Sequence, residues 1–166
     1  MLILRSPWSE PVFNCALEKY LLSVRTEDFL LFYINKPSVI VGRNQAIEAE
    51  CDTVFCKENN IPIIKRLSGG GTVWHDQGNI NWAFITKRDT GMLFDGDPLA
   101  PLIDALANFG VDAVAGVRKE ILVDGYKISG TASYSTAGRQ IFHGTMLHNS
   151  DLETMHKALA GNPGLR

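Results

Sequence analysis

KRLSGGGTVWHDQGNINWAFIT, residues 65–86, is the stretch that decides how this chain is organised. Three consecutive glycines at 69–71 interrupt a region that is otherwise rich in strand-forming residues. A glycine loses more backbone entropy on folding than any other residue, so such a run suits a place where bare N–H groups approach a ligand. Residues 80–86 alternate large apolar side chains with polar or small ones, as a half-buried strand does. The stretch predicts a ligand-facing glycine loop between strands, although an ordinary glycine-rich hairpin turn is the alternative.

The sequence on either side of this stretch predicts strands joined by tight turns, with helices between groups of strands. Apolar residues recur at three- and four-residue spacing over 11–25, and Asp97, Pro98 and Gly110 are typical of the two ends of a helix. The expected helices are 11–25, 48–60, 97–109 and 151–160. The expected strands are 29–35 and 37–42 (as a hairpin), 61–66, 72–76, 80–86, 120–125 and 126–132 (as a hairpin), and 141–149. This order predicts an α+β fold with a mixed, largely antiparallel sheet flanked by helices.

Composition excludes several classes of protein. The chain has 166 residues, 45% of them hydrophobic and 20% charged, which is typical of one globular domain. A net charge of −2 argues against non-specific binding to nucleic acid or to an anionic membrane, and no apolar run approaches the ~18 residues of a membrane span. Three cysteines without a CxxC pair favour a reducing cytoplasm and structural roles, and no metal site is predicted.

Two further segments carry candidate site residues. In DGYKISGTA, residues 124–132, the Asp-Gly pair predicts a tight hairpin turn that puts Lys127 beside small residues. A lysine so placed can bring its ammonium onto a carboxylate or phosphate, although a solvated hairpin lysine is the alternative. In FHGTML, residues 142–147, His143 is a candidate for the lining of a pocket, with a structural strand histidine as the alternative. His148 and His156 are expected at the surface.

The glycine loop does not match the two commonest nucleotide-binding patterns. No Lys-Ser or Lys-Thr follows it at the spacing of a Walker A loop, and the dinucleotide fingerprint is absent. Taken jointly, however, KRLSGGGTVWHDQGN (65–79), DGYKISGTA (124–132) and HGTML (143–147) closely resemble the lipoate–protein ligase and lipoyltransferase family. FNCALEK (13–19), VGRNQ (41–45) and NFGVDA (108–113) are also similar to segments of that family. The resemblance runs from Phe13 to Leu152.

The resemblance implies a fold, a reaction and partners. The fold is that of biotin and lipoate ligases, related to class II synthetases, as a single catalytic domain over 1–166. The lipoate carboxylate attacks the α-phosphate of ATP, with Mg²⁺, to give lipoyl-adenylate and pyrophosphate. A lysine of an acceptor domain then takes the lipoyl group as an amide. Acceptors would be lipoyl domains of 2-oxoacid dehydrogenase complexes or the glycine cleavage H protein, with no nucleic acid and no membrane as partner.

The resemblance also implies roles for individual residues. Lys127 is the catalytic residue, bridging the lipoate carboxyl group and the α-phosphate. Arg66 would hold phosphate or carboxylate, the glycines would lie along the lipoyl chain, and His143 would line the acyl pocket. Val73 and Trp74 would pack near the adenine, and His75 would order the nucleotide side. The residues so assigned to lipoate and ATP binding are Arg66, Ser68, Gly69, Gly70, Gly71, Val73, Trp74, His75, Glu120, Ser129 and His143.

Some features of the chain differ from the family pattern and keep two alternatives open. Lys65 replaces an arginine, Lys119 replaces a neutral amide, and Phe142 replaces a histidine. Family members usually continue beyond the equivalent of GNPGLR (161–166), so the domain is expected to be incomplete at its C-terminal end, without an accessory domain. The alternatives are a lipoyl or octanoyl transferase without adenylation and a non-catalytic lipoate-binding module. The thioester variant of transfer is disfavoured, because no cysteine follows Cys56.

Overall fold

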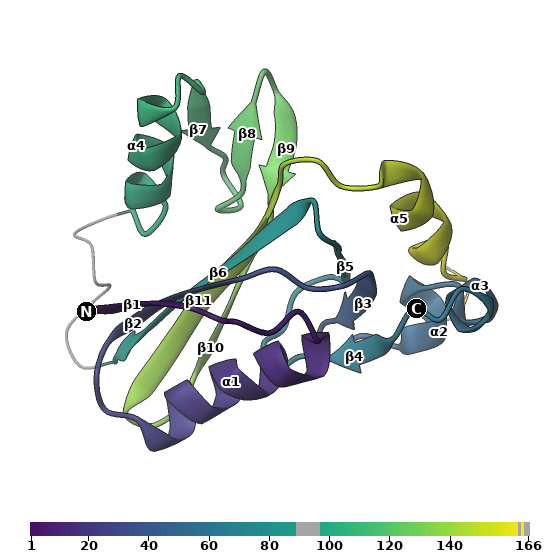
Figure 1. Ribbon diagram of the computed structural model, residues 1–166, viewed down its shortest axis with the longest axis horizontal. Helices are drawn as coiled ribbons and strands as arrows, with labels where there is room; N and C mark the ends of the chain where they lie inside the picture. The colour runs from purple at the N-terminus through teal and green to yellow at the C-terminus, as the bar shows by residue number, and fades with distance from the viewer. Residues whose placement is uncertain (89–96, 163, 165–166) are drawn as a thin grey trace.

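The computed structural model describes residues 1–88, 97–162 and 164, and its largest element is a five-stranded sheet (Figure 1). Its strands are β1 (Leu2–Arg5), β2 (Phe29–Tyr33), β6 (Asn79–Lys87), β11 (Arg139–Leu147) and β10 (Thr131–Ser135), in that spatial order. β1 runs parallel to β2, and the other neighbours are antiparallel. The predicted mixed, largely antiparallel sheet is therefore confirmed.

Two three-stranded sheets accompany the large one. One has the order β4 (Ile63–Lys65), β3 (Ser38–Val41), β5 (Val73–His75), with β3 parallel to β4 and antiparallel to β5. The other is an antiparallel sheet of β7 (Ala113–Ala115), β8 (Ile121–Val123) and β9 (Tyr126–Ser129). In Figure 1 the two small sheets lie at different places around the large one, and β9 contacts β11.

The helices are distributed over the three sheets. α1 (Pro11–Val24) lies along one face of the large sheet and contacts β6 and β11. α4 (Ala100–Asn108) packs beside β7, while α2 (Ile47–Glu50), α3 (Thr53–Glu58) and α5 (Leu152–Ala158) gather near β3 and β4 (Figure 1). None of these helices, nor any other in the described residues, is long and apolar enough to cross a bilayer.

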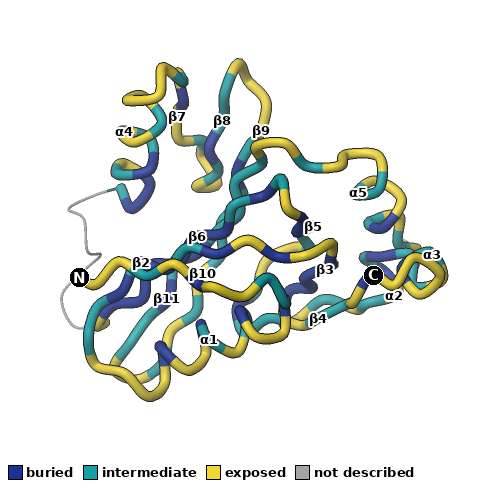
Figure 2. The backbone as a smooth tube through the Cα atoms, in the orientation of Figure 1, coloured by how far each residue is buried: buried dark blue, intermediate teal, exposed yellow. Residues whose placement is uncertain are grey.

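Three clusters of buried side chains hold these layers together, and the dark segments of Figure 2 follow them along β6, β3 and β2. Under α1, Leu21 and Leu22 meet Leu31, Ala83 and Ile85 of the large sheet. On the opposite face of β6, Trp82 and Phe84 pack against Leu99 near α4 and Ile121 of β8. The third cluster joins Val39, Val41 and Trp74 to Cys51, Cys56 and Ala158. β6 is thus covered on both faces, which makes it the central strand of the fold.

The hairpin expected from 29–35 and 37–42 is wrong. β2 pairs with β1 and β6, whereas β3 pairs with β4 and β5 in another sheet. Lys36 and Pro37 form the crossing between the sheets, and the Lys36 backbone N–H donates to the Ser9 carbonyl instead of closing a turn. A breaker pair therefore ends a strand without telling which strand becomes its neighbour.

Other boundaries differ in smaller ways. The helix expected over 48–60 is two helices, because Asp52 accepts hydrogen bonds from Val54 N and Phe55 N and starts α3 afresh. The helix expected from Asp97 begins at Ala100, since the Asp97 carboxylate closes a preceding turn through Leu99 N. The expected strand 126–132 divides at Gly130 into β9 and β10, which belong to different sheets. β1 and β7 were not predicted, and residues 163, 165 and 166 of the expected C-terminal loop lie outside the described residues.

Several predictions are confirmed. The helix over 11–25 is α1, and Gly110 directly follows the C-cap residue Phe109 of α4. The hairpin at Asp124-Gly125 joins β8 to β9, with φ of 51° and 79° as a type I′ turn requires. That turn positions the strand that carries Lys127.

Candidate active site

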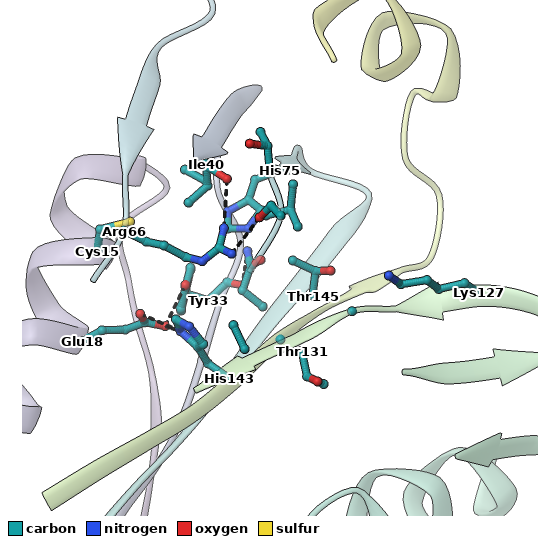
Figure 3. Close-up of a pocket in the computed structure, with 17 residues that line it drawn as sticks. Cys15, Glu18, Tyr33, Ile40, Arg66, His75, Lys127, Thr131, His143 and Thr145 are labelled. Atoms are coloured by element: carbon teal, nitrogen blue, oxygen red, sulfur yellow. Dashed lines mark hydrogen bonds and ion pairs between the residues drawn. The ribbon is translucent and has the colours of Figure 1, made fainter. Parts of the chain in front are cut away.

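A cavity of about 150 Å³ opens where the large sheet, the β4-β3-β5 sheet and α1 converge (Figure 3). Its walls draw on residues that lie far apart in the sequence. They include Cys15, Glu18, Tyr33, Ile40, Arg66, Gly71, Thr72, Val73, His75, Asn81, Lys127, Gly130, Thr131, Ala132, His143, Gly144 and Thr145. The structure therefore brings the glycine loop, the Lys127 segment and the His143 segment to one place.

Arg66 organises the glycine loop. Its Nη2 donates to the carbonyl oxygens of Gly69 (2.6 Å) and Gly71 (2.7 Å), and its Nη1 donates to Ile40 O (3.1 Å). Its Nε donates to Ser68 Oγ (2.9 Å). These bonds engage four of the five N–H donors of a guanidinium. Burial lowers the pKa of Arg66, and nearby Glu18 opposes that effect. Arg66 shapes the loop from inside, and its expected contact with phosphate or carboxylate stays a prediction.

Only part of the glycine loop borders the cavity. Gly71 lines it, whereas Ser68 is fully buried behind the loop. A Cβ at Gly69 or Gly71 would enter open space, but Gly70 has φ of +83°, a left-handed conformation that favours glycine. The three glycines thus differ in purpose: Gly70 is required by its backbone conformation, and its two neighbours leave open space around the loop.

A buried chain of hydrogen bonds forms the wall beside α1. Ser68 Oγ accepts from Arg66, so its hydroxyl proton is available to His143 Nε2 at 2.7 Å. His143 Nδ1 then donates to the Glu18 carboxylate (3.0 Å to Oε2), which also accepts from the Tyr33 hydroxyl (2.9 Å). Burial, and then the charge of Glu18, raise the pKa of Tyr33. His143 lies in the cavity wall with both ring nitrogens engaged.

His75 borders the same cavity and is 4% exposed. Burial lowers its pKa to about 3, and nearby Arg66 and His143 act in the same direction, so the ring is neutral at physiological pH. The resemblance assigned His75 to the nucleotide side, and the ring stands in the cavity that also contains Arg66 and His143.

Lys127 stands at the boundary between this cavity and a second one of about 160 Å³. Thr72, Val73, Gly130 and Thr145 also border both cavities. The remaining walls of the second cavity are Trp74, Ile128, Ser129, Leu147, Met155 and Leu159. The absence of a side chain at Gly130 leaves room for the ammonium group, because a Cβ on Gly130 would lie 3.3 Å from Lys127 Nζ. Figure 3 shows Lys127 at the opposite side of the pocket from Glu18 and His143, with its ammonium nitrogen turned from its strand toward the other pocket residues.

Two hydroxyl groups at the second cavity lack partners. Ser129 Oγ and Thr72 Oγ1 are buried and form no hydrogen bond with the described part of the chain. An unsatisfied buried hydroxyl is uncommon in native proteins and calls for an explanation such as a ligand or water. Both residues border the second cavity, and the two oxygen atoms are themselves buried.

Not every predicted residue lies in a cavity. Glu120 borders neither one; its Oε2 accepts from Arg118 N (2.8 Å) and its side chain packs on Gly116. Trp74 is buried, borders only the second cavity, and donates through Nε1 to Asp76 (2.9 Å). No group of three or more His, Cys, Asp or Glu side chains within residues 1–88, 97–162 and 164 is arranged to hold a metal ion.

The cavity residues that sequence reasoning missed include Cys15, Glu18, Tyr33 and Asn81. A signal existed for Glu18, because it shares the apolar face of α1 with Leu21 and Leu22 and is only 5% exposed. A carboxylate on the buried stripe of a helix requires partners, and here they are Tyr33 and His143. Cys15 carries no such signal, because it precedes the glycine loop and the expected position of a nucleophilic cysteine follows it.

The fold and the site define a class of protein. The family model described as "Lipoyl protein ligase A/B catalytic domain" matches residues 10–164, and the chain belongs to that family. Lipoate-protein ligase LplJ of Bacillus subtilis is 42% identical over 154 residues, covering 91% of this chain and 46% of the relative. Lipoate--protein ligase 1 of Staphylococcus aureus is 40% identical over 158 residues, covering 93% and 48%. The chain thus spans about half the length of these curated relatives.

Solved structures of lipoate ligases have the same fold as this chain. LipL1 of P. falciparum, described in complex with lipoate, superposes with a TM-score of 0.86 at 29% identity, covering 95% of this chain and 51% of that one. A lipoate-protein ligase A bound with ATP gives 0.82 at 26% identity, covering 95% and 70%. A bi-partite lipoate protein ligase from Thermoplasma acidophilum, described with its E2 lipoyl domain, gives 0.84 at 26%, covering 95% and 65%. The expected biotin/lipoate ligase fold is confirmed.

Proposed function

We propose that this chain carries the catalytic centre of an ATP-dependent lipoate–protein ligase. It would convert lipoate and ATP to lipoyl-adenylate and pyrophosphate, and then transfer the lipoyl group to a lysine of an acceptor domain. The observation that carries the proposal is the position of Lys127 between two adjoining cavities. The relatives' names and the lipoate- and ATP-bound neighbours support the same reaction.

The two cavities suit the two halves of an acyl-adenylate. The first is bounded by the glycine loop and by the buried wall of Glu18 and His143, and would receive the lipoyl chain. The second offers apolar walls at Leu147 and Met155 for a base and the unpartnered hydroxyls of Thr72 and Ser129 for polar groups of the nucleotide. The carboxyl group and the α-phosphate would then meet at the shared boundary, beside Lys127.

At that boundary the chemistry requires positioning and charge stabilisation more than a protein nucleophile. A carboxylate oxygen of lipoate attacks the α-phosphorus, the bond to the β-phosphate oxygen breaks, and pyrophosphate leaves. The ammonium of Lys127 would offset the negative charge shared by the carboxylate and the phosphate, which otherwise repel each other. In the second step the acceptor amine attacks the acyl carbon, AMP leaves, and the amine loses a proton.

Mg²⁺ is expected to accompany ATP. Magnesium commonly binds through substrate phosphates with one or two carboxylates and retained waters. Within the described residues no dedicated cluster of ligands exists, and Glu120, the acidic residue assigned to the site by resemblance, is hydrogen-bonded to the Arg118 backbone. The metal would therefore be held mainly by the phosphates of the nucleotide.

A transfer reaction through a cysteine thioester is less well supported. Cys15 lies in the wall of the first cavity, but burial and nearby Glu18 raise the pKa of its thiol to about 12. The thiolate, not the thiol, is the nucleophile, so Cys15 would be unreactive at neutral pH. Acceptors are proposed to be lipoyl domains of 2-oxoacid dehydrogenase complexes or the glycine cleavage H protein, and the cytoplasm stays the expected compartment.

The test is lipoate-dependent ATP–pyrophosphate exchange by the purified 166-residue chain. Exchange that requires lipoate, and that is lost in Lys127→Ala but kept in Lys57→Ala, is the expected result. Lys57 is an exposed lysine that borders neither cavity, which makes it a matched control. If a folded chain shows no exchange, synthetic lipoyl-adenylate and an acceptor domain are added to distinguish the two alternative functions. Transfer from the adenylate would indicate a transferase, and binding without transfer would indicate a non-catalytic module.

A further inference from the structure

A chain of buried side-chain amides leads from the backbone of Trp8 to His75. The carbonyl oxygen of Trp8 can only accept a hydrogen bond, and Asn14 Nδ2 donates to it at 2.9 Å. Asn14 Oδ1 is the opposite atom, and it accepts from Ser6 Oγ at 2.6 Å. The orientation of the Asn14 amide is therefore determined by its partners.

The next link follows from the first. Asn14 Nδ2 also lies 2.7 Å from Asn35 Oδ1, which must accept because the Asn14 amino group can only donate. This orients Asn35 so that its own amino group faces His75 Nδ1 at 2.9 Å. An amide NH₂ cannot accept, so His75 Nδ1 is the acceptor and carries no proton. Both asparagines are fully buried, so bulk solvent does not compete for these hydrogen bonds.

The tautomer of His75 follows. A neutral imidazole carries one proton, and with Nδ1 accepting, that proton is on Nε2. Within the described residues, Nε2 forms no hydrogen bond with the protein, and the ring borders the first cavity. His143, the other histidine of this cavity, has Nδ1 on Glu18 and Nε2 on Ser68. Of these two rings, only His75 has an N–H available to a ligand.

We propose that Asn35 is a positioning residue that locks His75 in the Nε2–H form, so that His75 donates a neutral hydrogen bond to an oxygen of the acyl ligand. This inference rests on the proposed function for the identity of the ligand, but the tautomer assignment does not. A neutral donor suits a site that already contains the Arg66 cation, because a second positive charge there would be repelled. The relay also explains why uncharged asparagines, and not acidic residues, are buried behind the ring.

The first measurement is nitrogen-15 NMR of the ligand-free chain labelled at histidine. The chain has four histidines, and the His75→Gln variant identifies the His75 signals. We expect a protonated Nε2 and an unprotonated Nδ1 for His75 throughout the neutral pH range. A protonated Nδ1, or averaged signals from both tautomers, would overturn the assignment whether or not the chain binds lipoate.

The second measurement compares variants of Asn35. In Asn35→Asp a carboxylate faces Nδ1, which draws a proton to that nitrogen, and in Asn35→Ser the relay is interrupted without adding charge. Both should change the His75 spectrum and weaken lipoate affinity by about tenfold, as the loss of one hydrogen bond does. Asn108→Asp is the control for the same substitution at an exposed position. Having two variants guards against one that fails to fold.

The outcomes separate the two proposals. An Nε2–H ring that changes in both variants while lipoate affinity is unchanged would overturn the role of His75 as a donor to the ligand. An Nε2–H ring in a chain that binds no lipoate at all would overturn the proposed function and leave the action of Asn35 on His75 intact. A coupled change of tautomer and affinity supports the inference in full.

Discussion

Gly42 and Gly70 meet backbone to backbone: a Cβ built on Gly42 would lie 1.9 Å from the carbonyl oxygen of Gly70. The first residue follows β3, and the second is the central glycine of the loop that precedes β5. The backbone N–H of Arg43 also donates to Ser68 O at 2.9 Å. The glycine loop is therefore seated on VGRNQ, residues 41–45, through main-chain atoms that no side chain can replace.

Gly42→Ala is predicted to destabilise the protein by about 3 kcal/mol, since the methyl group would collide with backbone that cannot move aside. Urea denaturation followed by circular dichroism measures the loss. Gly138→Ala is the matched control, because a Cβ there meets nothing within 4 Å. Equal stability of the two variants would contradict the seating of the loop on Gly42.

Gly130→Ala is predicted to impair catalysis more than stability. The new methyl group would lie 3.2 Å from Cε and 3.3 Å from Nζ of Lys127, and the flexible end of that side chain would shift. Displacing a catalytic group by a fraction of an ångström lowers the rate, here by about tenfold. Pyrophosphate exchange measures the rate and thermal denaturation the stability, with Gly138→Ala again as control. An unchanged exchange rate would show that the position of Lys127 does not depend on the space that Gly130 leaves beside it.

Lys127→Ala is predicted to reduce adenylation by about 10³-fold, the scale of a lost electrostatic contact in a transition state. Its unfolding free energy should change by less than about 0.5 kcal/mol, because the side chain is exposed. Lys127→Arg should not restore activity, since the planar guanidinium cannot act as the compact point charge that an ammonium supplies. Full activity of the arginine variant would show that positive charge alone suffices.

His75 makes stability fall as the solution is acidified. Its folded-state pKa, about 3, lies below the unfolded value of 6.5, so between these values only the unfolded chain takes up the proton. Stability should therefore drop as pH falls below 6.5, with a contribution from His75 of up to about 1.4 kcal/mol per pH unit. Urea midpoints at stepped pH measure the slope. His75→Gln should have a shallower slope, and identical slopes would contradict a buried neutral ring.

Cys15→Ser is predicted to retain adenylation and transfer, because a thiol whose pKa is raised to about 12 is protonated at neutral pH. Product formation on an acceptor domain is the measurement, with mass spectrometry to detect acyl groups on the wild-type thiol. A trapped thioester together with an inactive serine variant would instead favour the transferase.

Local signals predicted the elements whose formation depends on neighbours in sequence. Helical spacing located α1, and the Asp124-Gly125 pair located the turn before Lys127. Local signals did not predict which strands pair, because pairing depends on which sheet edge is free once the layers assemble. β2 and β3 are separated by four residues yet belong to different sheets, and β1 is a strand only because it pairs with β2.

The residues of the candidate site also fall into two groups, those that sequence motifs identify and those that they do not. The motifs located Lys127, the glycine loop and His143, since each lies in a short run of unusual composition. Glu18 lies in a helix, Tyr33 in a strand and Asn35 just after that strand, all in ordinary sequence. Their importance comes from contacts with residues 15 to 125 positions away in the chain. The available sequence signal was a polar side chain at a position where the pattern of the helix or strand predicts an apolar one.

The first cavity takes its walls from residues between Cys15 and Thr145, and from all three sheets. It therefore exists only when α1 and the three sheets are assembled together. A ligand bound there acts on the folding equilibrium of the entire chain, and at one hundred times its dissociation constant it would stabilise the native state by about 2.7 kcal/mol. Occupancy by substrate would thus protect the chain as a unit against heat and proteases, and the abundance of the folded protein would follow the supply of its ligand.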